Sequence, residues 1–250
     1  MLRCLKTLPL VLAVVGLGIF AMSCNTNSAQ VRFVNAIQNT QAYPPGALDV
    51  QFNTIKDFTS VAFGAASGSA YTSVPSGSDT VEGLEAGTST VIFTETGIGV
   101  NAGTQYTMIA TGFASGTGQN VVLKTFPDTN TAPTAGNVNF RVINAAPDSP
   151  ASVDIYIEPA PFSGSLTPPA TITGLAYQSA SNYVTLPWNS DGSGWLVYVC
   201  TAGSTIPSWI NGQSITGGSQ TTAAIRTIVL TDVANGTAIN PTAIVLNDLN

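Results

Sequence analysis

The sequence contains no histidine, and charged residues make up only 8% of its 250 residues. Without histidine, the chain cannot form a Ser-His-Asp triad, a histidine general base or a histidine metal ligand. Seven basic residues stand against 13 acidic ones, and the resulting net charge of −6 disfavours nucleic-acid binding. Hydrophobic residues reach 44%, which is too many for a highly charged disordered chain. The composition therefore predicts a folded protein, and it excludes several large classes of enzyme.

Cysteine is also scarce, with only three residues in the chain. Cys4 and Cys24 lie in or beside the N-terminal segment, so Cys200 has no partner and a disulfide framework is not expected. Cys200 ends the strand-like run 195–200, which predicts a small buried hydrophobic residue. The alternative, a reactive thiol, would need a neighbouring base or cation that the local sequence does not supply.

The first 23 residues are typical of a signal peptide. Arg3 and Lys6 precede a short apolar run over residues 8–20, which is too short for an ordinary membrane-spanning helix. Ala21-Met22-Ser23-Cys24 follows directly and resembles the lipobox of bacterial lipoproteins, although Ala21 stands where leucine is usual. We therefore expect lipidation at Cys24, and cleavage that leaves a free thiol there is the alternative. Residues 24–30 are predicted to be a tether, and Asn25 lacks the acidic character that favours inner-membrane retention.

The remaining sequence repeats one pattern of motifs in the same order. The period of about 110 residues is typical of a duplicated domain, because solenoid repeats are much shorter. The matched segments are 32–36 with 141–145, 48–52 with 153–157, 61–63 with 175–177, 71–75 with 183–187, 106–111 with 226–231, and 121–123 with 244–246.

Both copies have the pattern of β-strands. Apolar residues alternate with polar ones over 48–52 and 153–157, and short apolar runs are separated by clusters of Gly, Ser, Pro and Asn. We expect about seven short strands per copy and an all-β fold of two tandem, immunoglobulin-like antiparallel β-sandwiches. The predicted domains are residues 31–126 and 138–250, joined by a linker over 127–137.

The same motifs resemble a known protein family. The Arg-x-Val/Ile-Asn-Ala segments, the turn at 144–150, the strand at 153–156 and the Tyr-Thr-x-Ile-Ala-Thr-Gly strand at 106–112 are similar to those of the DUF4397 family. The family occurs in secreted bacterial proteins and lipoproteins, often in tandem, and its function is unknown. The resemblance covers nearly all of residues 31–247, but the second copy lacks the glycine after Thr231.

Several repeated polar residues are candidates for a site. Asp49 and Asp154 occupy matching positions, and alternation predicts that they point away from the buried face. Their repetition favours a structural role, such as accepting hydrogen bonds from turns or neighbouring strands, over catalysis by paired carboxylates. Arg32 and Arg141 also match, and we expect an Arg–Asp contact inside each sandwich. The segment 189–194 is interpreted as a hairpin turn, because one carboxylate would leave a calcium ion underliganded.

All three tryptophans belong to the second copy, and Trp188 and Trp195 flank its glycine-rich turn. Core packing is the more common role of tryptophan, but an exposed indole can stack on a sugar or anchor a protein partner. Trp188 and Trp195 are the predicted ligand-binding residues. No catalytic or metal-binding residue and no cofactor is predicted. The sequence thus favours a non-catalytic cell-envelope lipoprotein, at the outer membrane or cell surface, that binds a glycan or a protein. A structural spacer or self-associating coat component is the alternative.

Overall fold

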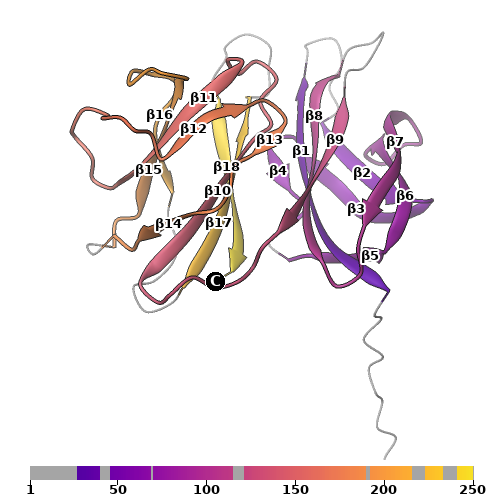
Figure 1. The fold of residues 1–250 in the computed structure, drawn as a ribbon. Helices are drawn as coiled ribbons and strands as arrows, with labels where there is room; N and C mark the ends of the chain where they lie inside the picture. Colours follow the sequence, from indigo (N-terminus) through magenta and orange to yellow (C-terminus); the bar gives the residue numbers. More distant parts are fainter. Residues whose placement is uncertain are drawn as a thin grey trace, which may run out of the picture.

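A computed structural model describes residues 27–39, 46–68, 70–114, 121–189, 192–215, 223–232 and 241–249. Within these ranges every regular element is a β-strand, and the strands form two halves that lie side by side (Figure 1). The predicted signal peptide and Cys24 lie outside the described residues. The prediction of an all-β fold with tandem β-sandwiches is confirmed.

The first half consists of two facing sheets. One sheet has the order β4-β1-β8-β9 with β5 also paired to β1, and the other has the order β3-β2-β6-β7. The strands are β1 (Ser28–Asn39), β2 (Ala47–Phe52), β3 (Ile55–Ala62), β4 (Ala65–Ala66), β5 (Thr72–Pro75), β6 (Gly77–Glu85), β7 (Val91–Val100), β8 (Gln105–Ala114) and β9 (Val122–Asp128).

The second half repeats this topology strand for strand. Its sheets have the orders β13-β10-β17-β18, with β14 paired to β10, and β12-β11-β15-β16. The strands are β10 (Asn137–Asn144), β11 (Ser152–Pro159), β12 (Ile172–Ala176), β13 (Ser179–Ala180), β14 (Val184–Pro187), β15 (Trp195–Thr201), β16 (Pro207–Ile215), β17 (Ala224–Thr231) and β18 (Thr242–Leu249).

One strand pair in each half is parallel, which differs from the purely antiparallel expectation. β1 runs parallel to β8, and β10 runs parallel to β17. A parallel pair cannot be joined by a hairpin, so the chain crosses to the opposite sheet and back between the two strands. Among the described residues each half has nine strands rather than seven, and two of the nine are the short strands that share the edge beside β1 or β10.

Each half has its own core between its two sheets. Leu48, Val50 and Phe52 on β2 point into the first core, and the matching residues Val153, Ile155 and Ile157 point into the second. The alternation read from the sequence therefore places the apolar face of both strands correctly.

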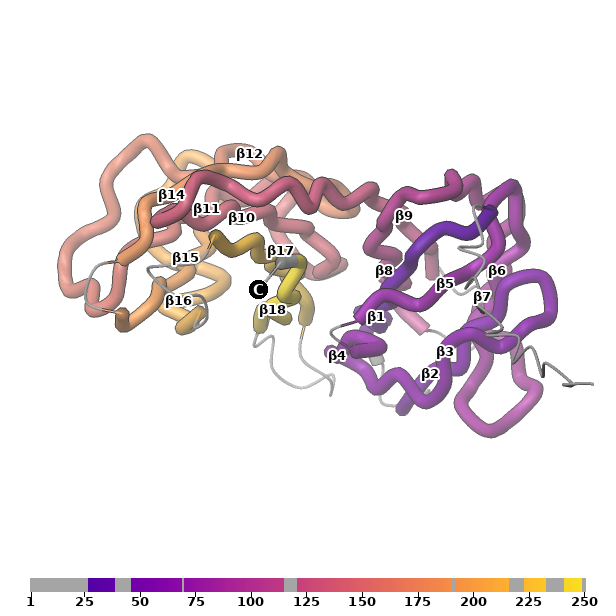
Figure 2. The backbone as a smooth tube through the Cα atoms, turned by 90° about the horizontal axis from the view of Figure 1, so that it is seen from below, coloured from indigo at the N-terminus to yellow at the C-terminus, as the bar shows by residue number. Residues whose placement is uncertain are grey.

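A third apolar cluster lies between the halves, where β1 and β8 face β10 and β17 (Figure 2). Val34 and Ile109 of the first half pack with Ile143 and Val229 of the second. These four strands are consequently buried on both faces, and polar residues such as Arg32, Arg141 and Thr227 are buried along with the apolar ones. The short segment between β9 and β10 connects two bodies that pack directly on each other.

The strand ends differ from the predicted boundaries. β1 begins at Ser28, so residues 28–30 belong to the first sandwich and not to a tether. Pro127 and Asp128 end β9, whereas the sequence placed them in the linker.

Candidate functional site

A hollow of about 270 Å³ opens at the end of the second sandwich, where the two predicted ligand-binding tryptophans meet. Trp188 follows β14 and Trp195 begins β15, and their rings are edge to face with centroids 4.9 Å apart. The hollow is lined by Ile157, Pro159, Leu186, Pro187, Trp188, Asn189 and Trp195.

The two indoles have different environments. Trp195 is 2% exposed and packs edge-on against Phe140 in the core, with ring centroids 5.0 Å apart. Trp188 is only half-buried, and its indole nitrogen has no hydrogen-bond partner. Trp195 therefore forms the closed side of the hollow, and Trp188 is the indole that a ligand could contact.

The turn between these tryptophans is partly described. The backbone N–H of Gly192 donates to the Asn189 carbonyl at 3.1 Å, as in a tight turn. The Asn189 side chain donates to the carbonyls of Ala160 and Gly194 at 2.7 and 3.0 Å, and this fixes the rim of the hollow. Residues 190 and 191 lie outside the described part of the chain.

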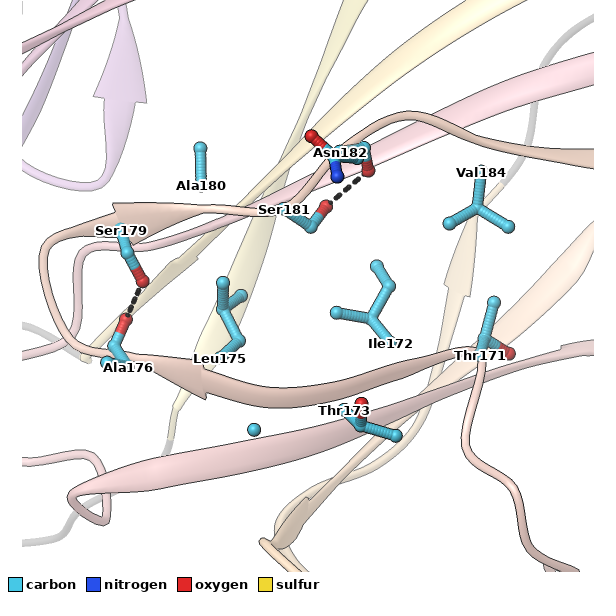
Figure 3. A pocket seen from close by; sticks show the side chains of 11 residues that line it. Thr171, Ile172, Thr173, Leu175, Ala176, Ser179, Ala180, Ser181, Asn182 and Val184 are labelled. Atoms are coloured by element: carbon cyan, nitrogen blue, oxygen red, sulfur yellow. Dashed lines mark hydrogen bonds between the residues drawn. The ribbon is translucent and has the colours of Figure 1, made fainter.

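A larger groove of about 460 Å³ lies between β12 and the segment containing β13 and β14 (Figure 3). Most of its hydroxyl groups already have partners in the protein. Ser179 Oγ donates to the Ala176 carbonyl at 2.5 Å, Ser181 Oγ donates to the Asn182 carbonyl at 2.8 Å, and Thr171 Oγ1 accepts the Ile157 N–H. Buried Ile172 and Leu175 close the groove from below. It contains no titratable side chain among its lining residues, so it lacks the groups for acid–base catalysis.

Asp49 and Asp154 have the structural role expected from their repetition, but they are not solvated. Asp49 is 3% exposed and accepts the N–H groups of Ser60 and Gly87 and the Lys56 ammonium. The hydrogen bond from Lys56 is the main reason that the pKa of Asp49 is lowered. Asp154 accepts the N–H groups of Gly174 and Gly203, both at 2.7 Å. Each carboxylate thus ties the neighbouring edge strand and a turn to the outer face of its sheet, and these segments exclude water from it.

The expected Arg–Asp contact inside each sandwich is found among the described residues only for Arg32 and Asp128 of the first half, and the two shorter ion pairs instead cross the interface between the halves. Arg32 Nη2 donates to Asp248 and lies 3.6 Å from Asp128, and Arg141 Nη2 donates to Asp128. All four side chains are at most 3% exposed. Neither arginine has an ion pair with Asp49 or Asp154 among the described residues.

A threonine in each half bridges the arginine and the aspartate of its own half. Thr107 Oγ1 accepts Arg32 Nε at 2.9 Å and donates to Asp128 at 2.8 Å. In the second half, Thr227 Oγ1 accepts Arg141 Nε at 3.2 Å and donates to Asp248 at 2.6 Å.

A tyrosine in each half covers the same arginine. The Arg32 guanidinium lies 5.1 Å from the centre of the Tyr71 ring, and Arg141 lies 4.9 Å from that of Tyr183. The Tyr71 hydroxyl donates to Asp128 at 2.7 Å, and burial raises the pKa of Tyr183 to about 12. The two halves therefore contribute equivalent sets of Arg, Tyr, Thr and Asp to one buried polar network.

The sequence analysis missed Asp128 and Asp248 because it aligned the last strands incorrectly. Residues 121–123 were matched with 244–246, but Leu123 pairs with Ala110 on β8, and the equivalent partner of Leu230 on β17 is Ala243. When the match is shifted by three residues, Asp128 and Asp248 occupy equivalent positions in the two copies. The shared spacing from each threonine to its aspartate could have revealed this equivalence.

Cys200 is buried and unpaired, as predicted. Burial raises the pKa of its thiol, which disfavours the reactive thiolate. It packs with Tyr156, Leu166 and Tyr198 on the outer face of β11 and β15, beneath the loop that connects β11 to β12.

Within the described ranges, no group of three or more acidic or cysteine side chains is arranged to hold a metal ion. None of the described residues forms a helix of the length and hydropathy needed to cross a bilayer.

The fold and these sites define a protein of two packed β-sandwiches with surface hollows and a buried polar interface. The family model described as "Domain of unknown function (DUF4397)" matches residues 29–156. The chain therefore belongs to the DUF4397 family, and the match covers the first sandwich and continues into β11. No curated protein matches the sequence.

Proposed function

We propose that this protein is a non-catalytic, lipid-anchored protein of the cell envelope that binds a glycan or a surface protein through its second sandwich. The observation that carries the binding role is the half-buried Trp188 in the wall of a 270 Å³ hollow. An indole presented on a rigid sandwich can pack against the apolar face of a sugar ring or against an apolar side chain. Trp195 and Phe140 support this indole from the core.

The tandem organisation supports the same proposal. Residues 137–249 repeat the strand order of residues 28–128, including the parallel pair and the divided edge. We therefore infer that residues 138–250 are a second DUF4397-like domain. Only the second domain has tryptophan, so binding by an indole would belong to one copy and not to both.

The binding experiment uses glycan arrays and titration calorimetry with the soluble body, residues 25–250. Trp188→Ala is expected to abolish binding, and Trp188→Phe is expected to retain part of it. Trp209→Ala is the matched control, because Trp209 also packs half-buried against the second core with an unpartnered nitrogen but does not line this hollow. Unchanged affinity in Trp188→Ala, or an equal loss in Trp209→Ala, would exclude the Trp188 site.

The anchor requires its own experiment. The predicted acyl chains on Cys24 would each contribute about 0.8 kcal/mol per buried CH₂, which is enough for stable membrane attachment when several chains are present. Membrane fractionation and mass spectrometry of the N-terminal peptide should find a lipidated Cys24 in the wild type. Cys24→Ser should release the protein, and an unmodified wild-type terminus would contradict the proposal.

A second candidate, a structural spacer or coat component, is favoured by the reciprocal ion pairs between the halves. Arg32, Asp128, Arg141 and Asp248 hold the two sandwiches in one orientation. Such a unit would act without a soluble ligand. Concentration-dependent assembly of the soluble body in size-exclusion chromatography would support a coat, and a sharp monomer at high concentration would argue against it.

A further inference from the structure

Asp232 occupies a position where the first half has glycine. Thr111 on β8 and Thr231 on β17 match in the repeat, and the residues that follow them are Gly112 and Asp232. Asp232 is 1% exposed, which is unusual for an aspartate without an arginine or lysine partner. At this position, therefore, the second half has a buried carboxylate and the first half has a glycine.

The charge of Asp232 is poorly compensated by the protein. Its Oδ2 accepts the backbone N–H of Asp148 at 3.2 Å, and its Oδ1 has no hydrogen-bond partner. Burial raises the pKa of Asp232 to about 6, and the nearby Asp148 carboxylate adds to the effect. Within the described part of the chain, neither Asp148 nor Asp232 forms an ion pair with a lysine or arginine. At neutral pH two carboxylates therefore lie close together.

The side-chain amide of Gln38, from the first half, contacts Asp148. Gln38 on β1 donates its Nε2 to Asp148 Oδ2 at 2.6 Å. Gln38 is 9% exposed, and its Oε1 is buried without a hydrogen-bond partner. The amide oxygen and nitrogen exchange places by a half-turn of the terminal group, so the oxygen can face the carboxylates instead.

We propose that Asp148, Asp232 and Gln38 bind a calcium ion that bridges the two sandwiches. Carboxylate and amide oxygens are the ligands that this hard cation prefers, and two carboxylates neutralise its charge. Asp148 is exposed, so water can complete a coordination shell of irregular shape. Magnesium requires stricter octahedral geometry and gives up its waters reluctantly, so it fits this mixed set less well.

Because the proposed ligands come from both halves, a bound ion links the two sandwiches. Asp148 and Asp232 follow β10 and β17 in the second half, and Gln38 belongs to β1 in the first. An ion that binds all three adds a link to the interface that already contains the arginine network. The ligand set resembles the weaker calcium sites of extracellular modules, for which dissociation constants are about 0.1–1 mM. The proposal depends on neither the lipid anchor nor the Trp188 site.

The test is calcium titration of the full chain in metal-free buffer, followed by isothermal calorimetry and thermal unfolding. The wild type should bind one calcium ion and unfold at a higher temperature in millimolar calcium than in the same concentration of magnesium. Asp232→Asn keeps the shape and removes the charge, and it should weaken calcium binding by about tenfold or more. Asp148→Asn should have a similar effect on binding, and its exposed position makes it the safer variant for folding.

Asp57→Asn is the matched control. Asp57 and Asp79 form another carboxylate pair in which each Oδ2 is buried without a hydrogen-bond partner. This variant should bind calcium as the wild type does. Absence of calcium binding, unchanged affinity in both Asp148→Asn and Asp232→Asn, or loss of binding in Asp57→Asn would overturn the proposal.

Discussion

The two sandwiches have the same topology but differ where they face solvent. At one end of the first sandwich, Asp79 is buried and hydrogen-bonded to Asn53 at 2.6 Å. Strand pairing places Trp195 at the equivalent position of the second sandwich, since Val81 pairs with Phe52 and Val197 pairs with Ile157. One end is therefore acidic and the other aromatic, on the same backbone.

The outer faces of the two halves also differ. β2 and β3 are joined by a tight turn at Asn53 and Thr54, both with positive φ. β11 and β12 are joined by a longer loop that places Phe162 and Leu166 on Tyr198 and encloses Cys200. The second half thus has an apolar cluster with no counterpart among the described residues of the first half.

The faces where the halves meet are alike. Each half contributes one arginine, tyrosine, threonine and aspartate, and each arginine pairs with the aspartate of the other half. Burying ion pairs in this way costs desolvation energy, and its best-attested benefit is a fixed register between the paired surfaces. The comparison indicates that the shared interface is constrained in both halves, whereas their exposed ends can diverge.

The strongest test of the shared interface removes one aspartate. Asp128→Ala should lower the free energy of unfolding by about 3–5 kcal/mol, because Arg141 stays buried without its carboxylate. Asp248→Ala should cost less, since Asp128 contacts both guanidinium groups. Urea denaturation measures both variants. Equal losses would show that the network is energetically symmetric, and losses below about 1 kcal/mol would show that its ion pairs are dispensable.

Replacing Asp49 or Asp154, the two outer-face aspartates, should cause the next largest loss of stability. Asp154→Ala should destabilise the protein by about 2–3 kcal/mol, because two backbone N–H groups, one on β12 and one in a turn, lose a charged acceptor. Asp49→Ala should have a similar effect, because it also removes two N–H acceptor contacts. Urea-induced unfolding monitored by circular dichroism compares them, with Glu158→Ala on β11 as a half-buried control. A negligible loss in Asp154→Ala would contradict the proposed role of this position.

The loop cluster found only in the second half should contribute less. Phe162 is half-buried against Tyr198, with ring centroids 5.7 Å apart. Phe162→Ala should lower the free energy of unfolding by about 1–2 kcal/mol and increase proteolysis of the loop at 160–171. Phe162→Leu should retain most of the stability. Unchanged proteolysis in the alanine variant would show that the ring does not hold the loop on the sheet.

The smallest expected effect distinguishes Asp49 from Asp154. Lys56 is 41% exposed in its side chain and bonds to Asp49 at 2.6 Å, so Lys56→Met should cost at most about 1 kcal/mol. The lowered pKa of Asp49 stabilises the fold above its ordinary pKa of 3.8, and this contribution is lost as pH falls through the lowered value. In Lys56→Met the pKa of Asp49 in the folded protein should be less lowered, so the loss should be smaller and should end at a higher pH. Unfolding curves between pH 2 and 5 would show this shift, and coincident acid transitions would contradict it.

Local patterns predicted much of each sandwich because side-chain alternation in a strand depends on neighbouring residues. The core faces of β2 and β11, the buried Cys200 and the repeated structural aspartates all follow from such patterns. The near-complete burial of Asp49 and Asp154 was not predicted, because the segments that cover them come from other parts of the chain. The burial of β1 and β17 on both faces depends on the packing of the other half, which no local pattern identified.

The sequence by itself determined the strand-rich class, the absence of histidine chemistry, the family motifs and the duplicated order of elements. Tertiary structure alone decided that Arg32 pairs with Asp248 and Arg141 with Asp128, that Trp195 is enclosed while Trp188 remains accessible, and that Gln38 meets Asp148. The physical reason is distance along the chain: hydrophobic alternation is set within a few residues. A buried charge instead finds its partner only when whole sheets pack, and here the pairing residues come from opposite halves.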